Sequence, residues 1–160
     1  MKGNDVDFDE FRTLKKQTEN EYKKILTVFC PALKSEVIFN TDGFHHLCYD
    51  NTRAERDKKV QRAKFIFLNK AVKIIEKTTT IQEFRCGICP VGKKDRSGLR
   101  KTKVIKWFAF WGIISVEKRT RIRVVVRQIG DGQFHFWSVM PFWNLSNGNR
   151  VIGSREVEDE

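Results

Sequence analysis

The sequence predicts an α+β fold in which one or two N-terminal helices pack on a four-stranded antiparallel β-sheet. Two observations predict it. Helical periodicity dominates the first half of the chain, and four β-type segments joined by turns follow one another from residue 78 onward. With 160 residues, 40% of them hydrophobic, the chain is long enough to bury the core of one domain.

The helices are predicted from the spacing of apolar residues. Over 7–29 these residues recur every three or four positions, and Asp7 with Glu10 makes a capping box at the start. Residues 36–40 predict a short strand, which a Thr-Asp-Gly turn follows. The clearest helix is expected over 52–77, where apolar side chains form one continuous stripe.

The strands are predicted from β-branched and aromatic runs. The first is expected at 78–85, and the others at 103–115, 120–128 and 133–141, the last after a Gly-Asp-Gly turn. A long basic loop, 86–102, separates the first two strands. Consecutive strands with short turns make an antiparallel meander, so helices should cover one face and leave the other face or a rim for a ligand.

We expect a single domain in three parts: an N-terminal helical segment (1–35), a main body (36–145) and a polar, acidic tail (146–160). No apolar run is long enough to cross a membrane, and the acidic N-terminus does not resemble a signal peptide. We therefore expect a cytoplasmic protein without a membrane partner, whose four cysteines are free thiols.

The charge balance is the first indication of function. The chain has 31 Lys and Arg against 20 Asp and Glu, which gives a formal net charge of +11 and a pI near 9.7. Such a charge attracts polyanions, and nucleic acid is the leading expectation. A basic protein without a nucleic-acid ligand is the alternative.

The third expected strand alternates arginine with valine and isoleucine over 121–127. A three-residue hairpin loop after it would place Arg127 opposite His135 and Val125 opposite Trp137. Guanidinium groups grip phosphate, and an aromatic ring beside them can stack on an unpaired base. A solvated sheet face is the alternative. The face in question would carry Arg121, Arg123, Arg127, His135 and Trp137.

Two further motifs bear on chemistry. His45 and His46 follow a glycine turn and precede Arg53 and Arg56, and a histidine near cations is a candidate general acid or base near pH 7. A purely structural role is the alternative for each histidine. Cys86 and Cys89 form one CxxC without a second pair at zinc spacing, so we expect no bound metal.

Three segments carry a resemblance to a known nuclease group: GFHHLCYDNTRAER, the helix that runs to IIEKTTTIQEFR, and the strands RIRVVVRQIGDGQFHFWSV. In this order they resemble the barnase–EndoU–colicin–RelE (BECR) nucleases, in their phage- and toxin-associated branches, over about residues 36–141. The resemblance implies a BECR-like fold, metal-independent cleavage of RNA, no cofactor, and an acidic antitoxin or immunity protein as a further partner.

By position, the resemblance implies the catalytic residues His46, Arg53, Glu83, Arg127 and Ser138. Ser138 alternates with residues on the expected core face, so a bulge or another register would be needed to turn it toward the others. The expected RNA-binding residues are Arg85, Lys93, Lys94, Arg96, Arg100, Arg121, Arg123, His135 and Trp137.

The first functional hypothesis is therefore a metal-independent endoribonuclease. The ribose 2′-OH would attack phosphorus, a histidine or Glu83 would take its proton, and arginines would stabilise the phosphoryl charge. The second hypothesis is a non-catalytic RNA-binding domain that uses the same basic and aromatic face. The third is a protein whose basic surface binds an acidic inhibitor.

Overall fold

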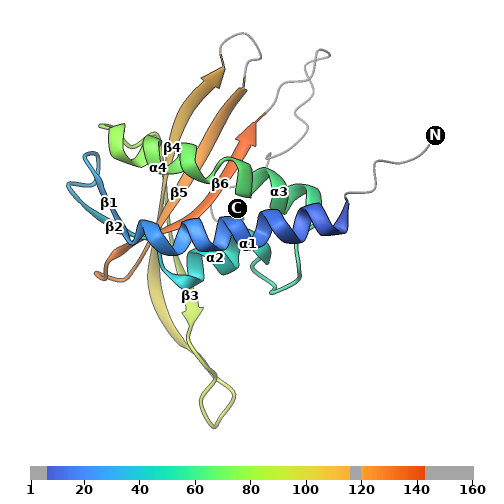
Figure 1. Cartoon of the computed structure of the whole chain (residues 1–160). Coiled ribbons are helices and arrows are strands. Elements are labelled where there is room, and N and C mark those ends of the chain that lie inside the picture. The colour runs from blue at the N-terminus through green and yellow to red at the C-terminus, as the bar shows by residue number, and fades with distance from the viewer. Residues whose placement is uncertain (1–6, 116–119, 143–160) are drawn as a thin grey trace, which may run out of the picture.

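The computed structural model describes residues 7–115 and 120–142, and these form an α+β fold with helices layered on one face of a single mixed sheet (Figure 1). The sheet order is β1-β2-β6-β5-β4-β3. The helices are α1 (Phe8–Ile25), α2 (Thr41–Cys48), α3 (Lys58–Ile66) and α4 (Leu68–Lys77). The strands are β1 (Thr27–Cys30), β2 (Ser35–Ile38), β3 (Glu83–Val91), β4 (Lys101–Ser115), β5 (Thr120–Ile129) and β6 (Phe134–Phe142).

The first helix is shorter than the sequence predicts. The Asp7 side chain caps α1 by accepting a hydrogen bond from the Asp9 amide, but the helix ends at Ile25 because Leu26 takes a positive φ of 60°. The chain continues as β1, with Val28 buried and Phe29 exposed. Helical spacing includes Phe29 in the helix because a separation of four residues from Ile25 fits both the helical period of 3.6 and the strand period of two.

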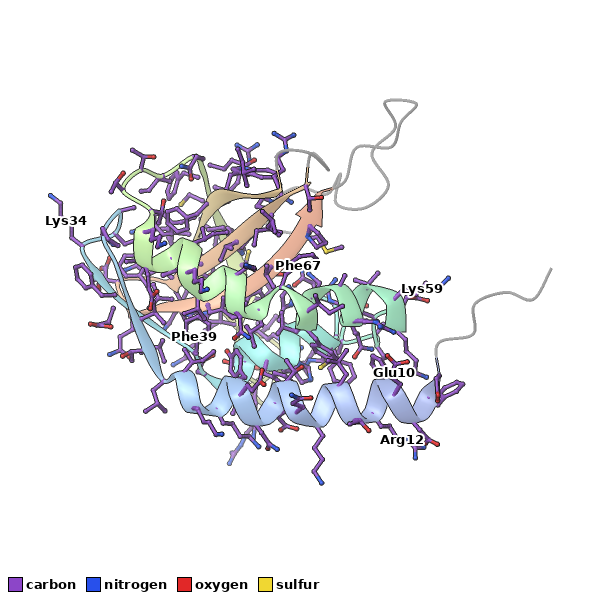
Figure 2. The ribbon with its side chains drawn as sticks, turned by 45° about the horizontal axis from the view of Figure 1, so that its top comes forward. Glu10, Arg12, Lys34, Phe39, Lys59 and Phe67 are labelled. Atoms are coloured by element: carbon purple, nitrogen blue, oxygen red, sulfur yellow. The ribbon has the colours of Figure 1, made fainter. Side chains whose placement is uncertain are left out.

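The single helix expected over 52–77 is two helices with an irregular segment before them. Asp57 caps α3 through the Lys59 amide, and Phe67 leaves helical geometry at φ −94° and ψ 3°. Figure 2 shows Phe67 at the junction of α3 and α4. The apolar stripe continues across this junction, so periodicity alone did not reveal the break.

The sheet has six strands and is mixed, so the expected four-stranded antiparallel sheet is incomplete. The four later strands do form an antiparallel meander, β3-β4-β5-β6. However, β1 and β2 form an antiparallel pair, and β2 joins β6 in parallel through the Val37–Phe134 and Ile38–His135 pairs. The N-terminal segment therefore contributes a strand to the same sheet as the main body.

The two faces of the sheet carry different clusters. The helices cover a large core that includes Val37, Leu47, Phe110, Val124 and Phe136. The opposite side, here called the second face, holds a smaller cluster of buried residues: Ile105, Trp107, Ala109, Val125 and Trp137. The two clusters alternate along the strands, as the pleat requires.

The edge of β6 positions the candidate site. In the described part of the chain, β2 pairs with β6 only at Phe134 and His135. Beyond His135, α2 and α3 pack against β6. Side chains from these two helices can therefore reach the second face.

None of the helices within 7–115 and 120–142 is both long and apolar enough to cross a membrane. The acidic tail expected at 146–160 lies outside the described residues.

We predict that Gly43→Ala destabilises the fold. A Cβ on Gly43 would come closer than 3.0 Å to the Tyr22 hydroxyl and the Phe136 carbonyl oxygen. The Tyr22 hydroxyl already donates a hydrogen bond to the Asn40 carbonyl, so it cannot move freely. Overpacking of this kind costs about 1–3 kcal/mol. Urea denaturation measures it.

Gly87→Ala is the matched control, because the nearest atom to its Cβ would be Trp107 at 3.6 Å, an ordinary contact. An equal loss of unfolding free energy in both variants would contradict the assigned packing of α2 on β6.

Candidate active site

A β-bulge in β6 shapes the site. The β5–β6 register shifts between Val126, which pairs with Phe136, and Val125, which pairs with Ser138. Trp137 is the extra residue, so the expected Val125–Trp137 pair is wrong, while the expected Arg127–His135 pair is confirmed. The bulge places Ser138 opposite Val125, on the second face.

The indole of Trp137 lies between two functional side chains. The His46 ring stacks on it at 3.9 Å between centroids, with 18° between the planes. The Arg127 guanidinium carbon is 3.4 Å from the same indole centroid. Two planar groups this close to one ring must occupy its opposite faces. An RNA base could therefore stack on Trp137 only by displacing one of them.

Both imidazoles contact a guanidinium group. Arg56 Nη2 lies 3.1 Å from His46 Nε2, and Arg127 Nε donates to His135 Nε2 at 3.0 Å. Arg56 Nε also donates to the backbone carbonyl oxygens of His46 and Tyr49 at the end of α2, where a cation is favoured by the helix dipole. A guanidinium can only donate, so each Nε2 is the acceptor and each ring carries its proton on Nδ1.

A buried lysine completes the group. Lys64 Nζ donates to Ser138 Oγ at 2.7 Å and to the Val139 carbonyl oxygen at 3.3 Å. Lys64 is 1% exposed and Ser138 is fully buried. We define the cationic cluster as His46, Arg56, Lys64, Arg127, His135, Trp137 and Ser138.

Burial and neighbouring cations keep the two histidines neutral. Burial first, then Arg56, Lys64 and Arg127, lower the pKa of His46 to about 2. Burial and then Arg127 lower the pKa of His135 to about 4. Burial lowers the pKa of Arg127 to about 10, so this group keeps its charge near pH 7.

Two indole N–H groups on the second face have no acceptor within the described residues. They are Trp107 Nε1 and Trp137 Nε1, and both are buried. A buried donor without an acceptor costs about 1–3 kcal/mol of folding free energy. A ligand oxygen beside the cationic cluster would remove that cost.

Glu83 belongs to a second group on the same face. Its carboxylate accepts from Trp111 Nε1 at 2.9 Å and lies 3.6 Å from Arg123 Nη1. The Arg121 guanidinium carbon lies 4.9 Å from the Trp111 ring centroid. Arg123 and Arg127 are four residues apart on β5, which separates them by about 13 Å. Glu83 is therefore not beside His46.

The structure brings together some of the predicted residues and not others. His46, Arg127 and Ser138 meet with His135 and Trp137, as described above. Arg53 is exposed between α2 and α3 at a positive φ of 66°, outside the cluster. The remaining predicted RNA-binding residues lie on β3, in the 92–100 loop or in the second group: Arg85, Lys93, Lys94, Arg96, Arg100, Arg121 and Arg123.

Sequence reasoning missed Lys64, and it noted Arg56 as a cation after the histidine pair without placing it in the site. Lys64 had a signal, because it lies four residues after Val60 and four before Leu68, on the apolar stripe of the helix. Nothing in the charged run that holds both arginines indicated that Arg56 rather than Arg53 would reach His46.

The CxxC lies on strand β3. Residues three apart on a strand point to opposite faces, so Cys86 and Cys89 are directed away from each other. Cys30 and Cys48 are buried free thiols.

Comparisons with protein-family models, with curated proteins and with solved structures give no match for this chain. The BECR resemblance therefore stays an expectation, and the geometry of the cationic cluster carries the functional conclusion.

We predict that the protein loses stability as the pH falls from about 6.5 to 4. Burial lowers the pKa of His135 from its ordinary 6.5 to about 4 in the fold, so the unfolded chain binds more protons in this window. Its contribution should amount to about 3 kcal/mol. His46 shifts in the same direction.

Urea denaturation at pH 7, 5.5 and 4.5 measures this loss. His135→Gln can still accept from Arg127 but takes up no proton, so its unfolding free energy should depend less on pH. The same pH dependence in both proteins would contradict the assigned burial of His135.

Proposed function

We propose that the chain is a metal-independent endoribonuclease whose active site is the cationic cluster. The observation that carries the proposal is the convergence of two neutral imidazoles and two guanidinium groups around Trp137. A binding surface needs only scattered cations, whereas attack by a 2′-OH needs a proton acceptor and fixed cations within reach of one phosphate.

The imidazoles are suited to accept the proton of the 2′-OH. A lowered pKa leaves His46 and His135 as neutral acceptors near pH 7. Each Nε2 accepts from a guanidinium, so Arg56 or Arg127 must turn to the phosphate before that nitrogen can take the proton. A bound phosphate would raise the pKa of both rings, which brings them closer to the range useful for proton transfer.

Fixed donors around the imidazoles would stabilise the charge that builds on the phosphoryl oxygens. Arg56 and Arg127 are the half-buried members of the cluster and would meet a phosphate first. The free N–H groups of Trp107 and Trp137 add neutral donors on the same face. One well-aimed donor contributes about 3–4 kcal/mol to the transition state.

Two of the expected catalytic residues take other roles in this proposal. The Glu83 carboxylate is engaged with Trp111 and Arg123, so a histidine rather than Glu83 accepts the proton. Ser138 holds Lys64 under the site and acts as a positioning residue. Because His46 is only 3% exposed, RNA must displace covering side chains before cleavage.

A non-catalytic RNA-binding domain is the second candidate. The burial of His46 and His135 favours it, since buried histidines are equally suited to a structural role. In either case the basic surface would also suit an acidic antitoxin or immunity protein.

We predict RNA cleavage that persists in EDTA and fails on a strand that lacks the 2′-OH at the cut site. His46→Phe should keep the stack on Trp137 but slow cleavage about a hundredfold or more, because it removes the proton acceptor. Gel analysis of labelled RNA measures the rate.

His45→Phe is the matched control, since His45 stacks on Tyr49 at 4.4 Å on a different side of α2. Thermal unfolding should show that both variants fold. Full activity of His46→Phe would place the active site elsewhere, and a wild-type protein that cuts no RNA would favour the binding domain.

We also predict different cleavage rates for variants of two arginines in the segment between α2 and α3. Arg56→Ala removes the donor to His46 and should slow cleavage at least tenfold. Arg53→Ala changes an exposed side chain outside the cluster and should have little effect. Cleavage rates that fall equally in both variants would contradict the assignment of Arg56.

A further inference from the structure

Strands β3 and β4 continue past the rest of the sheet. The last β4–β5 pair is Ile105 with Ile129, whereas β3 and β4 stay paired out to Val91 and Lys101. Residues 88–104 therefore form a two-stranded ribbon with a loop, here called the arm. Figure 1 shows the arm projecting from one end of the sheet, away from the helices.

The tip of the arm has a defined turn. Asp95 Oδ1 accepts hydrogen bonds from the Ser97 amide, the Ser97 hydroxyl and the Leu99 amide. Gly98 takes the positive φ of 82° that this turn requires. The hydrogen bonds, that of the Ser97 hydroxyl first, lower the pKa of Asp95, so the carboxylate stays engaged within the turn.

The arm concentrates positive charge at the surface. Between residues 93 and 103 there are six basic residues and one acidic residue, and all are exposed. The basic ones are Lys93, Lys94, Arg96, Arg100, Lys101 and Lys103. Like charges this close repel one another, and a polyanion would relieve that repulsion.

We propose that the arm binds the backbone of a double-stranded segment of the RNA that is cut at the cationic cluster. This inference rests on the proposed function. The sequence has no aromatic residue between Phe84 and Trp107, so the arm lacks the stacking platforms that bind single strands. Its cations suit phosphates, which dominate the recognition of duplex RNA across its wide minor groove.

The arm leads directly to the cationic cluster. Lys101 and Lys103 share the second face with Trp107, because they differ by even numbers of positions along β4. Trp107 pairs with Arg85 on one side and with Arg127 on the other. Lys103 lies four residues from Trp107, about 13 Å along the strand. A duplex held by the arm therefore ends beside the cluster.

The test compares two variants that each lose four charges. The arm variant carries Lys93→Gln, Lys94→Gln, Arg96→Gln and Arg100→Gln. The control carries Arg12→Gln, Lys16→Gln, Lys24→Gln and Lys34→Gln, all exposed on α1 or the β1–β2 turn; Figure 2 labels Arg12 and Lys34 there. The probes are a hairpin RNA and a single strand of equal length, both with 2′-O-methyl riboses to prevent cleavage.

We expect the arm variant to bind the hairpin at least tenfold more weakly by fluorescence anisotropy, and its salt dependence to fall by about one phosphate contact per lost charge. The control should lose much less affinity for the hairpin. The wild-type protein is assayed separately for cleavage of an unmodified RNA, so a wild type that cuts no RNA refutes the nuclease proposal and leaves the binding test intact.

Three outcomes would overturn the inference. Equal losses of hairpin affinity in the arm variant and the control would show that only net charge matters. A larger loss on the single strand would assign the arm to single-stranded RNA. Unchanged binding of the hairpin would show that the arm does not hold the RNA.

Discussion

The stacking of His46 and Arg127 on opposite faces of Trp137 is the contact on which the site depends. It joins α2 to β5 through one indole on the second face, beside the bulge in β6 that brings Ser138 to the same face. The contact is possible because, within residues 7–115 and 120–142, β2 pairs with β6 only at Phe134 and His135 on that side. A continuous sheet edge there would keep the helices on the core face only.

Packing cations around a buried indole sets the chemistry of this group. Burial disfavours charge, and the nearby guanidinium and ammonium groups hold the pKa of each imidazole below its usual value. The histidines are therefore neutral acceptors while the arginines keep their charge. An anion would stabilise this arrangement, because it offsets the repulsion among the cations and satisfies the indole N–H groups.

The second face divides into two surfaces with different properties. The cationic cluster is buried and has defined donor–acceptor geometry, which suits chemistry on one phosphate. The arm is exposed, carries many cations and lacks aromatic rings, which suits contacts with a long backbone without regard to its sequence. Their alignment along β4 follows from the twofold period of the strand.

Local periodicity determined much of this protein from the sequence alone. It predicted β4, β5 and β6 to within two residues, the pairing of Arg127 with His135, and the basic segment of the arm. The strand expected at 78–85 lies instead at Glu83–Val91, so about half of the expected loop 86–102 is paired strand. The parallel β2–β6 pair was decided only by tertiary structure, because it joins Val37 to Phe134, about 100 residues apart in the sequence. The Trp137 bulge lies within the β5–β6 hairpin, but the local pattern permits registers with and without it. Lys64 entered the site for the same reason: only the packing of α3 against β6 supplies Ser138 as its partner.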